Sequence, residues 1–111
     1  MTKAEILAII PQNGQTALTD GATITWDFSL GNAASVTLAG NRTLSITNMP
    51  NNSSGILFLT QDATGSRTLS VTGKKESGWA LSTGANKTDM LAVYKDSSGN
   101  LWWPKPSIDF A

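Results

Sequence analysis

The chain has 111 residues, no histidine and no cysteine, and its eight basic and eight acidic side chains cancel to a net charge of zero. These counts exclude His- and Cys-dependent catalysis, His-ligated metal sites, disulfides and thiol chemistry, and the scattered charges offer no electrostatic surface for nucleic acid or an anionic membrane. Only 14% of the residues are charged, below the roughly 25% of an average domain, so Thr, Ser, Asn and Gly carry the polar surface.

The N-terminal stretch Thr2–Ile10 is the one helix candidate in the sequence. It begins with a capping-box pattern, continues with an apolar stripe and is followed by proline. A helix this short is marginal in water, so it must dock on its own domain or on a neighbouring subunit. The apolar side chains that we expect to act as an anchor are Ile6, Leu7 and Ile10. We therefore divide the chain into an N-terminal helix or anchor segment, 1–12, and a single β-domain, 13–111.

Short runs of alternating apolar and polar residues follow, separated by turns rich in Gly, Asn and Asp. The expected strands are Ala22–Phe28, Ser35–Leu38, Thr43–Thr47, Ser54–Asp62, Arg67–Thr72, Trp79–Leu81, Thr88–Lys95 and Leu101–Trp103. Seven to eight short strands with closely spaced turns predict an all-β fold, either an antiparallel β-sandwich or a jelly-roll-like barrel, with the one short N-terminal helix.

The stretch Ser54–Asp62 differs from the other strands because its apolar residues are consecutive rather than alternating. A strand of this kind needs cover on both faces. It is either the central strand of the domain or a strand with one face on the core and the other on a partner chain. In the second case Leu57 and Leu59, or else Ile56 and Phe58, lie at a subunit contact.

A short repeat flanks this strand. Gly40–Thr47 and Gly65–Thr72 match at six of eight positions, 25 residues apart. We interpret the copies as two equivalent hairpin arms. Arg42 and Arg67 occupy the same place in the two copies; they either contact a carboxylate of a ligand or subunit, or cap turns on the surface of their own domain, and the repetition favours the structural role.

The tryptophans are the best candidates for function. Trp26 alternates with apolar residues and is expected in the core. Trp102 and Trp103 are consecutive in a strand and must point to opposite faces, so one of them leaves the core and joins a candidate oligomer interface. Trp79 and Tyr94 are the candidate contacts for a glycan or another surface partner.

No catalytic, metal or cofactor residues are predicted. The turn from Asp96 to Asn100 places oxygen atoms at alternating positions, but it lacks the closing glutamate and most acids of a calcium loop. We interpret it as a hairpin turn. No apolar run approaches the roughly 20 residues that span a bilayer, and the N-terminus has no convincing signal-peptide cleavage site. We therefore expect a soluble chain made without a secretory leader.

Several phrases together resemble small β-modules of tailed-bacteriophage virion proteins, of the tail-fibre, head-fibre and capsid-decoration types. The phrases that carry the resemblance are Ile24–Ser29, Val36–Asn48, Thr60–Val71, Trp79–Leu91 and Tyr94–Trp102. The resemblance implies an all-β structural module, often trimeric, without enzymatic activity. Two departures are that the module starts at its own methionine and that no coiled-coil or collagen-like stalk precedes it.

These observations lead to one functional expectation and one alternative. The chain is expected to be a non-enzymatic virion structural protein, made in the host cytoplasm and placed on the virion surface, where it forms a homo-oligomer and contacts capsid or tail proteins. The trimer follows from the resemblance alone. The alternative is a carbohydrate-binding module that recognises host surface glycan through an exposed tryptophan. Neither expectation involves a cofactor, nucleic acid or a membrane.

Overall fold

The computed structural model describes residues 15–110 and is about half β-strand. Its one helical element is a 3₁₀ turn, η1 (Phe28–Leu30), in that part of the chain. The strands are β1 (Thr16–Ala17), β2 (Thr23–Asp27), β3 (Ala33–Leu38), β4 (Arg42–Thr47), β5 (Ser53–Gln61), β6 (Leu69–Ser70), β7 (Lys74–Lys75), β8 (Thr88–Lys95), β9 (Leu101–Trp103) and β10 (Ser107–Phe110). The expected helix over Thr2–Ile10 lies outside the described residues. No helix in residues 15–110 is long and apolar enough to cross a bilayer.

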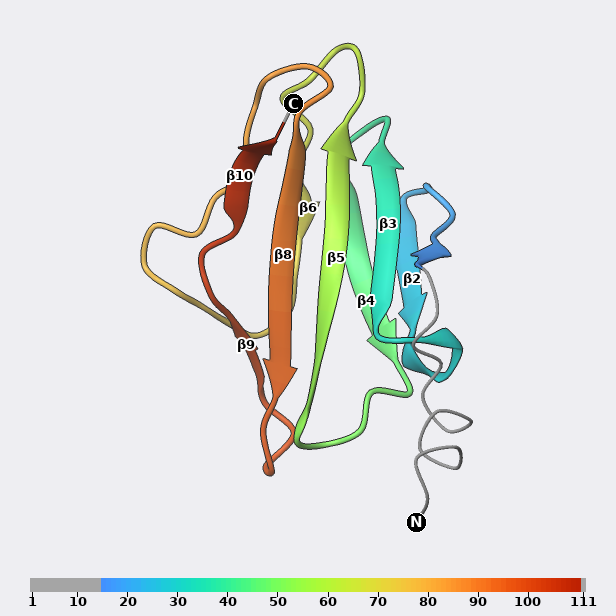
Figure 1. Ribbon diagram of the computed structural model, residues 1–111, viewed down its shortest axis with the longest axis vertical. Coiled ribbons are helices and arrows are strands. Elements are labelled where there is room, and N and C mark those ends of the chain that lie inside the picture. Colours follow the sequence, from blue (N-terminus) through green and yellow to red (C-terminus); the bar gives the residue numbers. More distant parts are fainter. Residues whose placement is uncertain (1–14, 111) are drawn as a thin grey trace.

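The strands form two sheets that lie face to face (Figure 1). The larger sheet has the strand order β1-β3-β5-β8-β9-β7, with β10 also paired to β8, and the smaller sheet has the order β2-β4-β6. In Figure 1 the smaller sheet lies behind the larger one.

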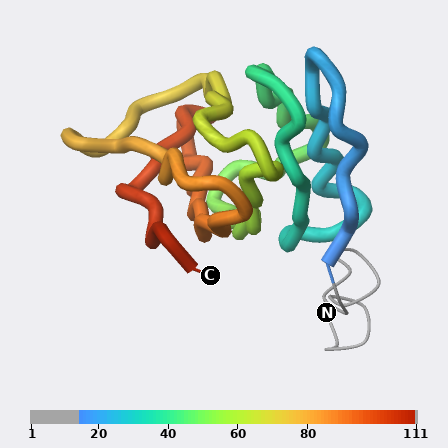
Figure 2. The backbone as a smooth tube through the Cα atoms, turned by 90° about the horizontal axis from the view of Figure 1, so that it is seen from above, coloured from blue at the N-terminus to red at the C-terminus, as the bar shows by residue number. Residues whose placement is uncertain are grey.

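The first six strands alternate strictly between the two sheets, so the chain winds as a coil. The pairs β1–β3, β3–β5, β2–β4 and β4–β6 are all parallel, whereas β5–β8, β8–β9 and β8–β10 are antiparallel. Figure 2 looks along the long axis and shows the successive turns, from blue to yellow-green, side by side. The arrangement resembles the stacked turns of a solenoid, closed by an antiparallel unit.

The prediction of an antiparallel sandwich or jelly-roll-like barrel is therefore wrong, because both sheets contain parallel pairs. The physical reason lies in the turns. A Gly-Asn or Asp-Gly turn joins two neighbouring strands of one sheet or two strands of facing sheets equally well, and the sequence alternation is the same in both cases. Here the turns after β1 and β3 cross from one sheet to the other.

The sequence repeat marks consecutive turns of this coil rather than hairpin arms. Its two copies contain β4 and β6, which are parallel neighbours. Arg42 lies opposite Leu69 instead of Arg67, a shift of two residues relative to the repeat. A shift of two keeps every side chain on its own face of the strand, and Leu44 and Leu69 accordingly both face the core.

The core lies between the sheets and is built from alternate residues of the long strands. Its buried apolar residues are Ile24, Trp26, Phe28, Ala34, Val36, Leu38, Leu44, Met49, Leu57, Leu59, Leu69, Leu91, Val93 and Trp103. The strand β5 lies between β3 and β8, so this stretch is central in the strand order of the larger sheet. It presents Leu57 and Leu59 to the core and Ile56 and Phe58 to the outside.

Candidate functional site

Of the residues predicted for an oligomer interface, Leu57, Leu59 and Trp103 belong to the core. Leu57 and Leu59 have no exposed surface, and Trp103 is 2% exposed. Their side chains point toward the smaller sheet because strand residues alternate between faces, so they cannot contact a partner chain in this fold. Trp102, on the opposite face of β9, is 45% exposed and remains a surface candidate.

The outer face of the larger sheet carries an apolar band in place of the predicted leucines. The band, which we call the outer stripe, consists of Ile56, Phe58, Met90 and Ala92. Ile56 lies opposite Ala92 and Phe58 opposite Met90 across the antiparallel pair β5–β8. All four are only partly buried. The partner-contact alternative that named Ile56 and Phe58 is the one that the burial pattern favours.

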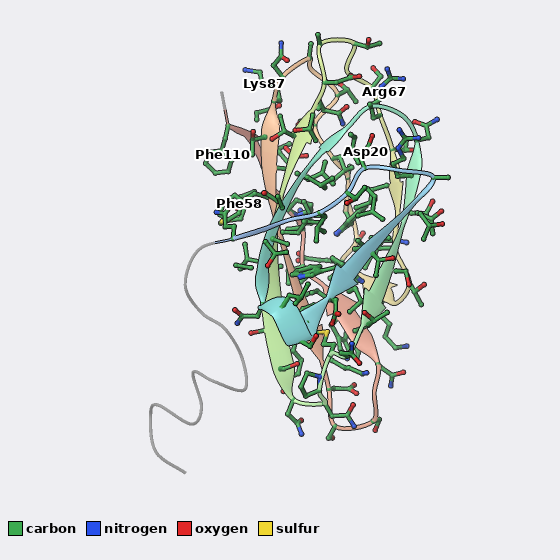
Figure 3. The ribbon with its side chains drawn as sticks, turned by 90° about the vertical axis from the view of Figure 1, so that its right-hand side faces the viewer. Asp20, Phe58, Arg67, Lys87 and Phe110 are labelled. Atoms are coloured by element: carbon green, nitrogen blue, oxygen red, sulfur yellow. The ribbon has the colours of Figure 1, made fainter. Side chains whose placement is uncertain are left out.

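Polar residues border the outer stripe on β3, and a further aromatic residue extends it on β10. Ser35 pairs with Phe58, and Thr37 pairs with Thr60. Phe110, 51% exposed, pairs with Thr88 at the end of β8. Figure 3 shows Phe58 and Phe110 on the same side of the molecule. The sheet therefore has an apolar outer centre with a hydroxyl-bearing margin.

Two exposed aromatic side chains lie together at the other end of β8. Tyr94 is opposite Trp102 in the antiparallel pair β8–β9, and both are more than two-fifths exposed. The Trp102 indole Nε1 donates a hydrogen bond to Asp96 Oδ2 at 2.8 Å, and Lys74 Nζ lies 5.5 Å from the indole ring centroid. The structure thus joins a predicted interface residue and a predicted glycan contact in one place.

Trp79, the second predicted glycan contact, does not join this pair. It is partly buried and packs edge-on against Trp103 with ring centroids 6.4 Å apart. Lys75 Nζ lies 5.8 Å from the Trp79 ring. The predicted strand Trp79–Leu81 is absent from the described structure, which places these residues in a loop against the core. Trp79 therefore packs against the core next to Trp103 and is not a freely exposed ring.

The two repeated arginines make ion pairs within the chain. Arg42 donates to both carboxylate oxygens of Asp20 at 2.8 and 2.9 Å, and Arg67 donates to both oxygens of Asp62 at 3.3 and 3.1 Å. These hydrogen bonds are the largest cause that lowers the pKa of each aspartate. Both pairs lie at the corners where the coil passes between the sheets, so they serve the turns, as the structural interpretation expected.

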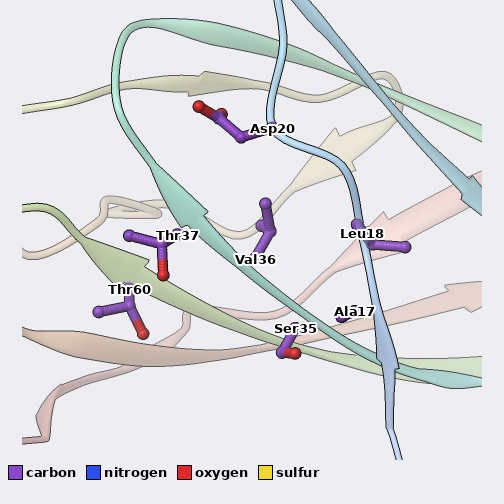
Figure 4. Close-up of a pocket in the computed structure, with 7 residues that line it drawn as sticks. All are labelled: Ala17, Leu18, Asp20, Ser35, Val36, Thr37 and Thr60. Carbon is purple, nitrogen blue, oxygen red and sulfur yellow. The ribbon is translucent and has the colours of Figure 1, made fainter.

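A surface depression of about 510 Å³ lies beside this corner. Figure 4 shows that residues of the chain around β1, of β3 and of β5 line it, with Thr37, Ser35 and Thr60 supplying hydroxyls. Its one ionisable side chain, Asp20, is already paired with Arg42. Among the described residues no group of three His, Cys, Asp or Glu side chains could hold a metal ion.

The candidate anchor residues Ile6, Leu7 and Ile10 lie outside the described residues. Sequence reasoning missed Met90, Phe110 and Lys74. The alternation of β8 placed Met90 on the face opposite Leu91, which was a usable signal. The contact of Lys74 with Trp102 depends on the parallel pairing of β7 with β9, which no local pattern reveals.

Comparison of the chain with protein-family models, with curated protein sequences and with solved structures gave no match.

The corner ion pairs predict how stability depends on pH. Because the folded state lowers the pKa of Asp20 and Asp62 below the ordinary 3.8, their contribution is present above that value and is lost as the pH falls through the lowered pKa. We expect the urea midpoint to be constant near neutral pH and to fall on acidification below about pH 4. In Arg42→Gln this fall should be smaller. An unchanged acid dependence in that variant would contradict the assignment.

Proposed function

We propose that this chain is a non-enzymatic structural module of a bacteriophage virion that assembles with copies of itself through the outer stripe. The observation that carries the assembly is the stripe itself, an apolar band on the middle of a sheet whose four side chains stay partly exposed in the described chain. Exposed apolar patches of this kind mark contact surfaces. The zero net charge of the chain removes long-range repulsion between copies.

The virion assignment rests on the resemblance of the strand and turn phrases between Ile24 and Trp102. The fold is compatible with it, because the resemblance implies a β-rich structural module and the described chain is a coil of short strands closed by an antiparallel unit. The trimer, the capsid or tail partners and the virion-surface location follow from the same resemblance. The anchoring role of Ile6, Leu7 and Ile10 also stays a prediction.

Solution mass tests the assembly. We expect light scattering over a dilution series to give three times the 11.7 kDa of one chain. Phe58→Glu should give the mass of one chain, because it places a charge in the centre of a desolvated contact. The control is Thr25→Glu, an exposed position on the outer face of β2 in the other sheet, which should keep the wild-type mass. A wild-type chain that is monomeric at every concentration would refute assembly through the stripe.

A second candidate function, recognition of a surface glycan, is favoured by one specific observation. Tyr94 and Trp102 are exposed and lie opposite each other on β8 and β9. The residue of β7 that pairs with Trp102 is Lys74, which is not apolar. Exposed indole and phenol rings offer flat apolar faces with polar edges, which suits sugar rings. The pair lies on β8 and β9, beyond Ile56 and Ala92, where the outer stripe ends.

A further inference from the structure

A pocket of about 360 Å³ opens beside Trp102, at the edge of the larger sheet. Its lining consists of Lys74, Lys75, Glu76, Trp102, Trp103 and Pro104. The volume lies within the usual range for small-molecule sites, about 300–1,000 Å³. The parallel pair β7–β9 builds it, since Lys74 lies opposite Trp102 and Lys75 opposite Trp103. The pocket thus joins the exposed ring of Trp102 on one strand with the Lys74 cation on its neighbour.

The aromatic part of the pocket is held in place before any ligand arrives. Asp96 accepts hydrogen bonds from the indole of Trp102 at 2.8 Å and from the backbone N–H groups of Ser98 and Asn100, both at 2.9 Å. The hairpin turn therefore fixes the orientation of the indole. A fixed platform loses little conformational entropy when it binds, which favours affinity.

The charge of the pocket selects the ligand class. Lys74 and Lys75 project over the rings of Trp102 and Trp79, and no ion pair with an acid is recorded for either within residues 15–110. Two acids lie nearby and both accept hydrogen bonds: Glu76 accepts the backbone N–H of Lys105 at 3.0 Å, and Asp96 accepts the indole N–H of Trp102. Lys74 is therefore a cation beside the indole that has no acidic partner of its own in the described chain, and such a cation attracts an anionic group.

We infer that this pocket binds an acidic saccharide, whose ring stacks on Trp102 while its carboxylate pairs with Lys74. The inference rests on glycan recognition, the second candidate function above. A pyranose ring presents C–H groups to the negative face of the indole, and a sugar carboxylate is ionised at neutral pH. Lys74 is already over the ring, so it needs only a change of rotamer to meet a carboxylate on a stacked sugar.

Calorimetric titration with matched sugars tests the inference on the full chain. The probes are trigalacturonate, its methyl ester (the same rings without charge), and sialyllactose with lactose as its neutral partner. Binding of trigalacturonate or of sialyllactose, and clearly weaker binding of the corresponding neutral sugar, is the expected result; which acid binds distinguishes uronic from sialic sugars. Added salt should weaken binding of the acidic sugar, because it screens exposed charges.

Four variants locate the site. Trp102→Ala should weaken binding of the acidic sugar about tenfold or more, and Trp102→Tyr should restore part of it. Lys74→Gln should weaken it about fivefold and reduce its salt dependence. Lys87→Gln, a lysine at the far end of the molecule from β9, is the matched control and should bind like wild type (Figure 3). Unchanged urea midpoints confirm that the variants fold.

The outcomes distinguish a failure of the acidic preference from a failure of glycan recognition. Equal affinity for the acidic and the neutral sugars would overturn the acidic preference and leave glycan recognition standing. No binding of any of the four probes would overturn both. Wild-type affinity in Trp102→Ala or in Lys74→Gln would show that the ligand binds elsewhere and would overturn the site.

Discussion

Replacing Trp103 with alanine is expected to lower the free energy of unfolding by about 3–5 kcal/mol, the range for removing a buried tryptophan. Trp103 is 2% exposed, packs edge-on against Trp79, and donates its indole N–H to the carbonyl oxygen of Thr72 at 2.9 Å. Alanine leaves a cavity between the sheets and leaves the Thr72 carbonyl without this partner. The measurement is urea unfolding at one fixed protein concentration, because assembly adds concentration dependence.

The adjacent Trp102 provides the matched control. It lies in the same strand with nearly half of its surface exposed, so Trp102→Ala should cost less than about 1 kcal/mol. The contrast tests the assignment of the two faces of β9 directly. Equal losses in the two variants, or a larger loss for Trp102, would show that the wrong face of β9 has been placed in the core.

Replacing Asp89 with alanine is expected to cost about 3 kcal/mol, because three hydrogen bonds to its buried carboxyl group disappear together. Asp89 has no exposed surface and faces the core side of β8. It accepts from Ser82 N at 2.8 Å, from Ser82 Oγ at 2.6 Å and from Asp109 N at 3.2 Å. It thereby ties the loop before β8 and the strand β10 to the sheet.

The loss in Asp89→Ala should be local as well as global. Hydrogen exchange of the Ser82 and Asp109 amides should accelerate more than exchange in β2 or β4, which lie in the other sheet. Asp109→Asn is the control: its side chain is exposed, and asparagine tolerates the left-handed backbone found there, φ 64°. It should change stability by less than about 0.5 kcal/mol. A loss below 1 kcal/mol in Asp89→Ala would contradict the bridging role.

Most of the long strands could be located from the sequence. The expected Thr88–Lys95 and Leu101–Trp103 have the same bounds as β8 and β9, and the expected Thr43–Thr47 differs from β4 by one residue. Each of these stretches lies between turn-forming residues, so local information suffices to locate it. The strands that the sequence did not reveal are short. β7 was expected to be loop, and β10 was expected to be a tail, because both exist only through pairing with β9 and β8.

The candidate site was accessible to sequence reasoning only in part. Two consecutive tryptophans in a strand must face opposite ways, and one of them does leave the core. The choice between them depends on which face of β9 meets the smaller sheet. Likewise, the apolar run in β5 required cover on both faces, but the set that faces outward, Ile56 and Phe58, depends on how β5 pairs with β3 and β8.

The sequence by itself determined the all-β character, most strand positions, the exclusion of His- and Cys-based chemistry and the alternation of faces, because each depends on residue types within a few positions of one another. Only the tertiary structure decided that the repeat forms parallel turns of a coil, that Leu57 and Leu59 are core, and that Lys74 meets Trp102. These features depend on strand pairing between residues far apart in the chain. Short turns of the same composition permit more than one pairing, and burial of the shared core selects among them.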